Sequence, residues 1–194
     1  LGRKVGENSG KLYKAARWPV GDTAIMAAWK QDLSVCTDRV DGARAAFTDA
    51  IGLSLPVVEL NTANTTTSAR EKAAAAVRVH RDVRHWVVWG CNDENTIGVV
   101  AALEAAGVAP ADIIGVGINA DLSCRDWRHG RRTGNKASLL IAGQDIGATA
   151  STGWSTRCAW GGSCRRRGSA GRSSSTRRTG APPAYPAPDA GVRR

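Results

Sequence analysis

Apolar residues change spacing along the first 119 residues, and this change predicts the secondary structure. Short apolar runs bounded by polar turns predict strands over residues 22–29, 55–60, 84–90 and 111–119. Apolar residues three or four positions apart predict helices over residues 2–16, 36–52 and 93–107. Helix propensity alone predicts one more helix, over residues 69–80. This alternation is typical of right-handed βαβ units, so we predict an α/β fold with an open parallel sheet and helices on both faces.

The regular pattern ends after residue 119. Residues 120–132 show no clear period and are expected to be irregular, whereas residues 133–153 again resemble a strand and a helix. Residues 154–194 are rich in Arg, Gly, Ser, Ala and Pro and contain no Leu, Ile, Met or Phe. Such a segment buries too little apolar area to offset its chain entropy. We therefore expect one lobe over residues 1–153 and a disordered tail over residues 154–194.

The net charge of +10 is concentrated in that tail. Residues 1–119 contain 13 basic and 13 acidic side chains, whereas residues 154–194 contain nine Arg and one Asp. The charge is therefore no sign that the lobe binds nucleic acid. A nucleic-acid-binding arm remains an alternative for the tail, but Trp154 and Trp160 lie only at its start and form no regular stacking platform.

The cysteines and histidines indicate no metal site and no catalytic set. The five cysteines are odd in number and fit no zinc spacing. We expect no disulfide framework, and we interpret Cys36 and Cys91 as isolated small core residues. The three histidines, His80, His85 and His129, form no metal-like group, and the sequence contains no Ser–His–Asp set, phosphate loop or carboxylate pair. We therefore predict neither an enzyme nor a cofactor.

Three polar residues follow predicted strands and are expected to meet at one edge of the sheet. Arg39 lies near the start of the helix after strand 22–29, Asn92 lies just after strand 84–90, and Asn119 ends strand 111–119. Open parallel sheets bind ligands just beyond the carboxyl ends of their strands. Asn and Arg present planar sets of hydrogen-bonding groups, which suit ligands that are rich in hydroxyls.

Four stretches of the first 119 residues show a family resemblance: GKLYK, AIMAAWKQDLSVCTDRVDGA, VRHWVVWGCNDENTIGVVAALEAAG and APADIIGVGIN. They resemble the carboxyl-side lobe of the arabinose-binding proteins, which are periplasmic sugar-binding components of ABC transporters. The stretch TGNKASLLIAGQDIG is similar to a later part of that lobe. The resemblance implies one lobe of a type I periplasmic-binding fold and an arabinose-like monosaccharide as ligand. It also implies a periplasmic location, a membrane permease as partner, a monomer, and no nucleic acid.

Members of this family have two lobes, and we expect this chain to be partial and to lack the amino-terminal one. The chain also departs from the family at residues 120–132 and from about residue 154 onward. These departures have the composition of a GC-rich gene read out of frame. A frameshifted gene and a genuine divergent tail are both open explanations.

The resemblance also implies roles for single residues. Arg39 matches an arginine that reaches the ring and hydroxyl oxygens of the sugar, and Asn92 and Asn119 match asparagines that bond to hydroxyls. Cys91 falls where the family often has a larger residue against the sugar, which implies a roomier pocket. Asp121 is the candidate for an acidic residue that the family places after the last asparagine, although the spacing here is altered.

Each of these residues also has a simpler interpretation. Asn92 could be only the helix N-cap, and its role as a sugar contact leaves the cap to Asp93. Asn119 could be an ordinary turn residue, because Asn tolerates unusual backbone dihedral angles. Arg39 could be a solvated helix residue paired with a neighbouring Asp.

Two further alternatives concern the tryptophans and the protein class. Trp29 could stack on a sugar or belong to the core, whereas Trp86 and Trp89 are expected in the core. The effector domain of a bacterial repressor shares the two-lobed sugar-sensing fold and is the alternative function. A repressor would carry a helix-turn-helix at its amino terminus, so the sequence upstream would discriminate between the two classes.

Overall fold

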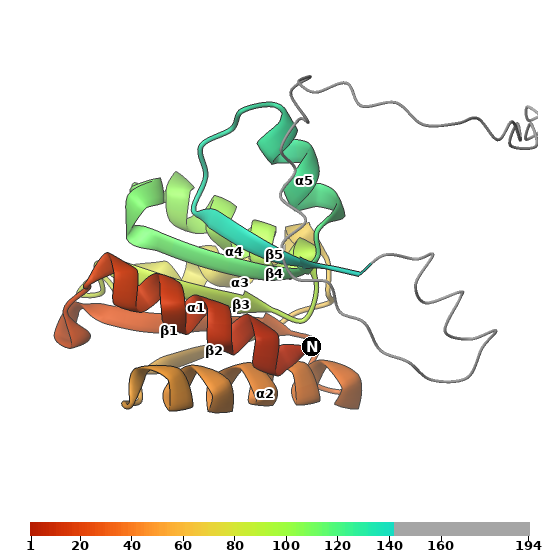
Figure 1. Cartoon of the computed structure of the whole chain (residues 1–194). Coiled ribbons are helices and arrows are strands. Elements are labelled where there is room, and N and C mark those ends of the chain that lie inside the picture. Colours follow the sequence, from red (N-terminus) through yellow and green to blue (C-terminus); the bar gives the residue numbers. More distant parts are fainter. Residues whose placement is uncertain (142–194) are drawn as a thin grey trace, which may run out of the picture. The chain divides into compact units, whose positions relative to one another are not determined.

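A computed structural model describes residues 1–141 of the chain. Five strands form one sheet in the order β2-β1-β3-β4-β5, and every neighbouring pair is parallel. The strands are β1 (Thr23–Trp29), β2 (Val57–Asn61), β3 (His85–Gly90), β4 (Ile113–Asn119) and β5 (Asn135–Leu140). The predicted open parallel sheet is therefore confirmed, and β3 lies inside it between β1 and β4 (Figure 1).

Residues 1–141 contain the four predicted helices and one further helix, α5 (Asp121–Arg128). The predicted helices are α1 (Gly2–Ala16), α2 (Ser34–Ile51), α3 (Thr66–Val79) and α4 (Asp93–Ala105). Helix α2 ends at Gly52, whose φ of 76° suits glycine, and the side chain of Thr65 caps α3 by accepting from the backbone N–H of Ser68. No helix among residues 1–141 is long and apolar enough to cross a membrane.

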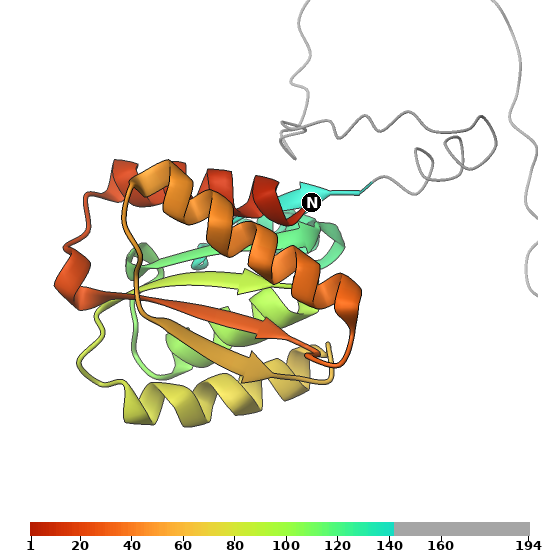
Figure 2. The same ribbon diagram turned by 90° about the horizontal axis from the view of Figure 1, so that it is seen from below.

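The two faces of the sheet are covered by different helices, which gives the lobe two apolar cores (Figure 2). Helices α1 and α2 cover one face, where Phe47 packs against Trp89. Helices α3 and α4 cover the other face, where Leu103 and Trp86 are completely buried. The expected core positions of Trp86 and Trp89 are confirmed. Because both faces are covered, the strands read as continuous apolar runs.

Helices α1 and α2 approach each other closely through glycines of α1. A Cβ atom at Gly6 would overlap the backbone oxygen of Ala43 on α2. We therefore expect Gly6→Ala to lower the free energy of unfolding by about 1–3 kcal/mol in urea denaturation, because one helix must move away from the other. Gly21→Ala is the matched control, since its Cβ would meet nothing within 4 Å. Equal stability of the Gly6→Ala variant and the wild type would contradict this packing.

Residues 120–132 correct one expectation, because they contain the eight-residue helix α5. The helix is too short for its apolar pattern to repeat, and tertiary contacts hold it at two points. Asp93, which is 1% exposed, accepts hydrogen bonds from the backbone N–H and the hydroxyl of Ser123 at 2.9 and 2.5 Å. The indole of Trp127 donates to the backbone oxygen of Asn135 on β5 at 3.1 Å. Helix α5 is thus attached at one end to α4 and at the other to the sheet.

The structure describes only the first part of residues 133–194, up to residue 141. The strand expected within residues 133–153 is present as β5. The helix expected after it and the tail over residues 154–194 lie outside the described residues.

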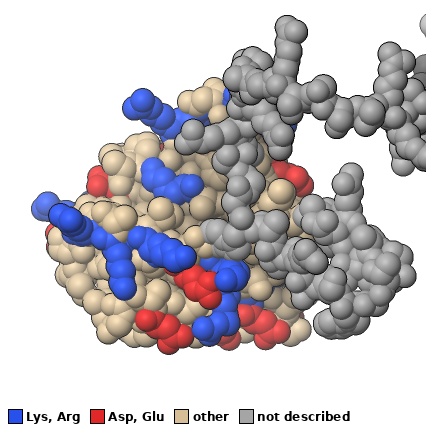
Figure 3. Space-filling view, in the orientation of Figure 1, with Lys and Arg blue, Asp and Glu red and all other residues tan. Residues whose placement is uncertain are grey.

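Positive charge on α1 is partly neutralised by local ion pairs. Lys and Arg side chains are visible along α1 in Figure 3, with acidic side chains nearby. Lys4 pairs with Glu7 at 3.0 Å, and Arg3 pairs with Asp49 at 3.5 Å. All four side chains are substantially exposed, so these pairs contribute little to stability.

Candidate functional site

The carboxyl edge of the sheet contains a topological switch point between β1 and β3. These strands are direct neighbours, yet α2 follows β1 on one face and α4 follows β3 on the other. The two chain segments therefore separate at the edge, which is where ligands bind in open α/β sheets. The segments that begin α2 and α4 form the two sides of this edge.

A disulfide between Cys36 and Cys91 joins these two sides. The expectation that Cys36 and Cys91 are isolated core residues is therefore wrong. Cys36 lies in the first turn of α2, Cys91 directly follows β3, and both are almost fully buried. The two cysteines come after β1 and β3, which are neighbouring parallel strands, and the fold therefore brings them together. The number and spacing of cysteines in the sequence do not reveal this pairing. The side chain of Cys91 is thus linked to α2.

Arg39 extends from the second turn of α2 toward the same turn of the chain. Its Nη1 donates to the backbone oxygen of Cys91 at 2.8 Å, and its side chain is partly buried. The ion pair with a neighbouring Asp that the sequence allowed is not among the ion pairs of residues 1–141. A guanidinium has five N–H donors, so most of this fork remains for another partner.

Asn92 is the N-cap of α4, because its Oδ1 accepts from the backbone N–H of Asn95 at 3.0 Å. The suggestion that Asp93 takes the cap is wrong, since Asp93 is buried against Ser123. The Nδ2 of Asn92 donates to the backbone oxygen of Asn64 at 3.0 Å. One Nδ2 hydrogen and one lone pair of Oδ1 remain for a ligand. Capping and ligand contact are therefore compatible roles for this side chain.

Asn119 ends β4 at the same edge of the sheet, in an unusual backbone conformation. Its φ is 104°, and the following Ala120 has a φ of 66°. Two consecutive non-glycine residues with positive φ cost free energy, and such strain clusters at functional sites. The Nδ2 of Asn119 donates to Asp121 at 3.1 Å, so these two candidates contact each other. Asp121 begins α5 and is exposed.

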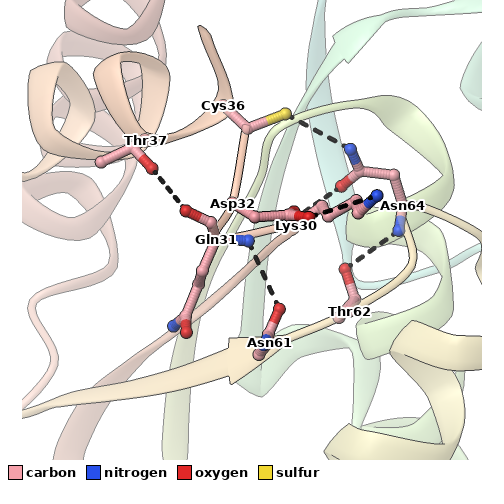
Figure 4. Close-up of polar contacts among 8 residues, drawn as sticks. All are labelled: Lys30, Gln31, Asp32, Cys36, Thr37, Asn61, Thr62 and Asn64. Carbon is pink, nitrogen blue, oxygen red and sulfur yellow. Dashed lines mark hydrogen bonds and ion pairs between the residues drawn. The ribbon is translucent and has the colours of Figure 1, made fainter. Parts of the chain in front are cut away.

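Asn64 connects several parts of this edge and was not among the candidates from the sequence (Figure 4). Its Oδ1 accepts from the backbone N–H of Lys30 at 2.9 Å and from the side chain of Asn95 at 2.8 Å. Its Nδ2 lies 3.3 Å from the sulfur of Cys36. Asn64 follows β2, so the reasoning applied to the other strand ends would have included it. Its φ of 58° is one that Asn tolerates better than most residues.

The remaining aromatic candidate belongs to the core. Trp29 is 5% exposed, and its indole donates to the hydroxyl of Thr37 at 3.2 Å. Its ring therefore packs in the core, which was one of its two interpretations. Within residues 1–141, no group of three or more His, Cys, Asp or Glu side chains could hold a metal ion.

The carboxyl edge of the sheet therefore carries an arginine, two asparagines and an exposed carboxylate. This set can donate to and accept from the hydroxyl groups of a small polar ligand. The binding roles of Arg39, Asn92, Asn119, Cys91 and Asp121 stay predictions at this point.

Comparison with known proteins relates the chain to sugar-binding proteins. It is 32% identical over 142 residues to the L-arabinose-binding periplasmic protein of Escherichia coli (strain K12), which covers 71% of this chain and 43% of that protein. It is 29% identical over 120 residues to the ABC transporter L-arabinose-binding periplasmic protein of Azospirillum brasilense, covering 61% of this chain and 36% of that protein. The chain thus spans less than half the length of these relatives. No protein-family model matches it.

Solved structures agree on the fold. A periplasmic ribose ABC transporter structure from Conexibacter woesei DSM 14684 matches 67% of this chain and 43% of its own, with a TM-score of 0.53 and 22% identity. A LacI family transcriptional regulator from Arthrobacter sp. FB24, in complex with lactose, matches 75% and 51%, with a TM-score of 0.52 and 21% identity. At such identities these similarities concern the fold alone. The chain has the fold of the type I periplasmic binding proteins and is a relative of the L-arabinose-binding periplasmic proteins, less than half of whose length it spans.

Proposed function

We propose that this lobe binds an arabinose-like monosaccharide at the carboxyl edge of its sheet, as part of the substrate-binding component of an ABC sugar transporter. The observation on which the proposal rests is the placement of Arg39, Asn92 and Asn119 at that edge, beside the switch point between β1 and β3. The names of the two curated relatives support arabinose as the sugar and transport as the context. They are binding proteins, and we assign no catalytic step to this chain.

The proposed contacts use the hydrogen-bonding capacity that the protein leaves open. Arg39 directs its unused N–H donors at the ring oxygen and a hydroxyl of the sugar. Asn92 uses its second Nδ2 hydrogen and the second lone pair of Oδ1 on a neighbouring hydroxyl. Asn119 contributes its Oδ1 oxygen, and Asp121, which accepts from the Asn119 amide, also accepts from a hydroxyl of the sugar. Cys91 contributes to the wall of the site through its backbone, because its sulfur is bonded to Cys36.

A periplasmic location is part of the proposal. Disulfides form and persist in oxidising compartments, among them the bacterial periplasm, and are rare in the cytosol. The buried Cys36–Cys91 disulfide supports this location, as do the names of the relatives. The proposed partner is a membrane permease that receives the sugar, and the proposed state of the protein is a monomer.

The sugar-effector domain of a transcriptional regulator is the second candidate function. The lactose-bound LacI family structure has the same fold, and the fold by itself does not separate the two classes. The sequence relationship to arabinose-binding periplasmic proteins and the disulfide favour transport. A cytosolic regulator works in a reducing compartment, where this bond would not persist.

Nuclear magnetic resonance titration of the ¹⁵N-labelled chain with L-arabinose tests the proposed site. We expect millimolar sugar to shift the amide signals around Arg39, Asn92 and Asn119. Asn92→Ser should abolish the shifts near Asn92, because serine keeps the cap acceptor and lacks the amide donors. Arg78→Ala, at the far end of α3, is the matched control and should leave the titration unchanged. Shifts confined to another face, or no shifts at all, would refute the proposal.

A further inference from the structure

Two candidate sugar contacts belong to segments that are connected by a closed ring of bonds. The disulfide joins Cys36 to Cys91, and the peptide bond joins Cys91 to Asn92. Asn92 Nδ2 donates to the backbone oxygen of Asn64 at 3.0 Å. The side-chain Nδ2 of Asn64 donates to the sulfur of Cys36 at 3.3 Å, which completes the ring. We call these four residues the edge ring.

The edge ring is directly connected to both Arg39 and Asn92. Arg39 is one helical turn beyond Cys36, and its guanidinium donates to the backbone oxygen of Cys91 at 2.8 Å. Asn92 is itself a member of the ring. The two side chains come from α2 and from the start of α4, which lie on opposite faces of the sheet. Pairing of β1 with β3 holds the strand ends together, and the ring adds a link between the segments that begin the two helices.

We infer that the Cys36–Cys91 disulfide and Asn64 are positioning residues, which hold Arg39 and Asn92 in the geometry that receives the sugar. The inference rests on the proposed sugar site. A site whose side chains are already held in place loses less conformational freedom on binding, and therefore binds more tightly for the same contacts. The disulfide supplies the covalent part of this restraint, and the Asn64 side chain connects it to the loop after β2.

Two variants open the ring at different places. Cys36→Ala/Cys91→Ala removes the covalent link. Asn64→Gly removes the Asn64 amide together with its contacts to Lys30 and to the Asn95 side chain, which the cysteine variant leaves in place. Glycine adopts the positive φ of this position without strain. Leu103→Ala is the matched control, because it creates a cavity in the core near the other end of α4 and leaves the ring intact.

The first readout is hydrogen exchange of the backbone N–H of Asn95, which donates to Asn92 Oδ1. Its protection is measured relative to that of the backbone N–H of Val99 in the same helix. We expect both ring variants to lower this relative protection roughly fivefold, as for the loss of one helix cap. Leu103→Ala should leave the ratio unchanged. Unchanged protection in both ring variants, or an equal loss in Leu103→Ala, would overturn the inference whatever the sugar does.

The second readout is the affinity for L-arabinose from the nuclear magnetic resonance titration. Both ring variants are expected to bind roughly fivefold or more weakly than the wild type, while Leu103→Ala, if folded, binds as the wild type does. Equal affinity of wild type and ring variants would overturn the inference. If the wild type binds no sugar but the ring variants still lose Asn95 protection, the proposed function fails while the positioning of Asn92 by the ring is supported.

Discussion

Removal of the Cys36–Cys91 disulfide is expected to lower the free energy of unfolding by about 4 kcal/mol. The bond closes a loop with a sequence separation of 55 residues, which includes β2, α3 and β3. Without it the unfolded chain gains conformational entropy, and the folded state loses that advantage. The double variant Cys36→Ala/Cys91→Ala should therefore unfold at a much lower urea concentration. The fluorescence of the buried Trp86 and Trp89 reports the transition.

Val35→Ala is the matched control for this experiment, because Val35 precedes Cys36 and is 54% exposed. We expect it to change the free energy of unfolding by less than about 0.5 kcal/mol. Peptide mass spectrometry without reductant should find the peptide of Cys36 linked to that of Cys91. A double variant within about 1 kcal/mol of the wild type would show that the bond adds little to the folded state.

The 194-residue chain by itself is expected to bind L-arabinose with a Kd of about 1 mM or weaker. Arg39, Asn92 and Asn119 supply hydrogen bonds to the sugar at one open edge. Each such bond, made where water has access, contributes a net free energy of about 0.5–1.5 kcal/mol. Three of them provide about 1.5–4.5 kcal/mol, from which the cost of association must still be subtracted. Isothermal titration calorimetry at micromolar protein and sugar should therefore show no saturable heat.

The same chain at millimolar sugar provides the positive control, since its amide signals should then shift. Asn92→Ala should remove these shifts as well, although it also removes the cap of α4. Saturable binding at micromolar concentration, lost in Asn92→Ala, would show that the contacts of this one lobe suffice. It would contradict the low value assigned to each contact.

Much of the fold was predictable because local patterns and tertiary packing agree. Strands such as β3 are apolar on both faces, and helices such as α2 end at a glycine that permits the positive φ of a C-cap. Helix α5 was missed because it has only eight residues, too few for an apolar pattern to repeat. The buried carboxylate of Asp93 holds it from another helix, and no pattern within residues 120–132 reveals that partner.

At the candidate site, the sequence by itself determined which residues follow the carboxyl ends of the strands, because strand and helix periods are local properties of the chain. The parallel sheet then necessarily brings Arg39, Asn92 and Asn119 to one edge. Only the tertiary structure decided which strands are neighbours, and with it the Cys36–Cys91 disulfide and the contacts of Asn64. Pairings between residues that are tens of positions apart depend on strand order and helix placement, which result from packing of the whole lobe.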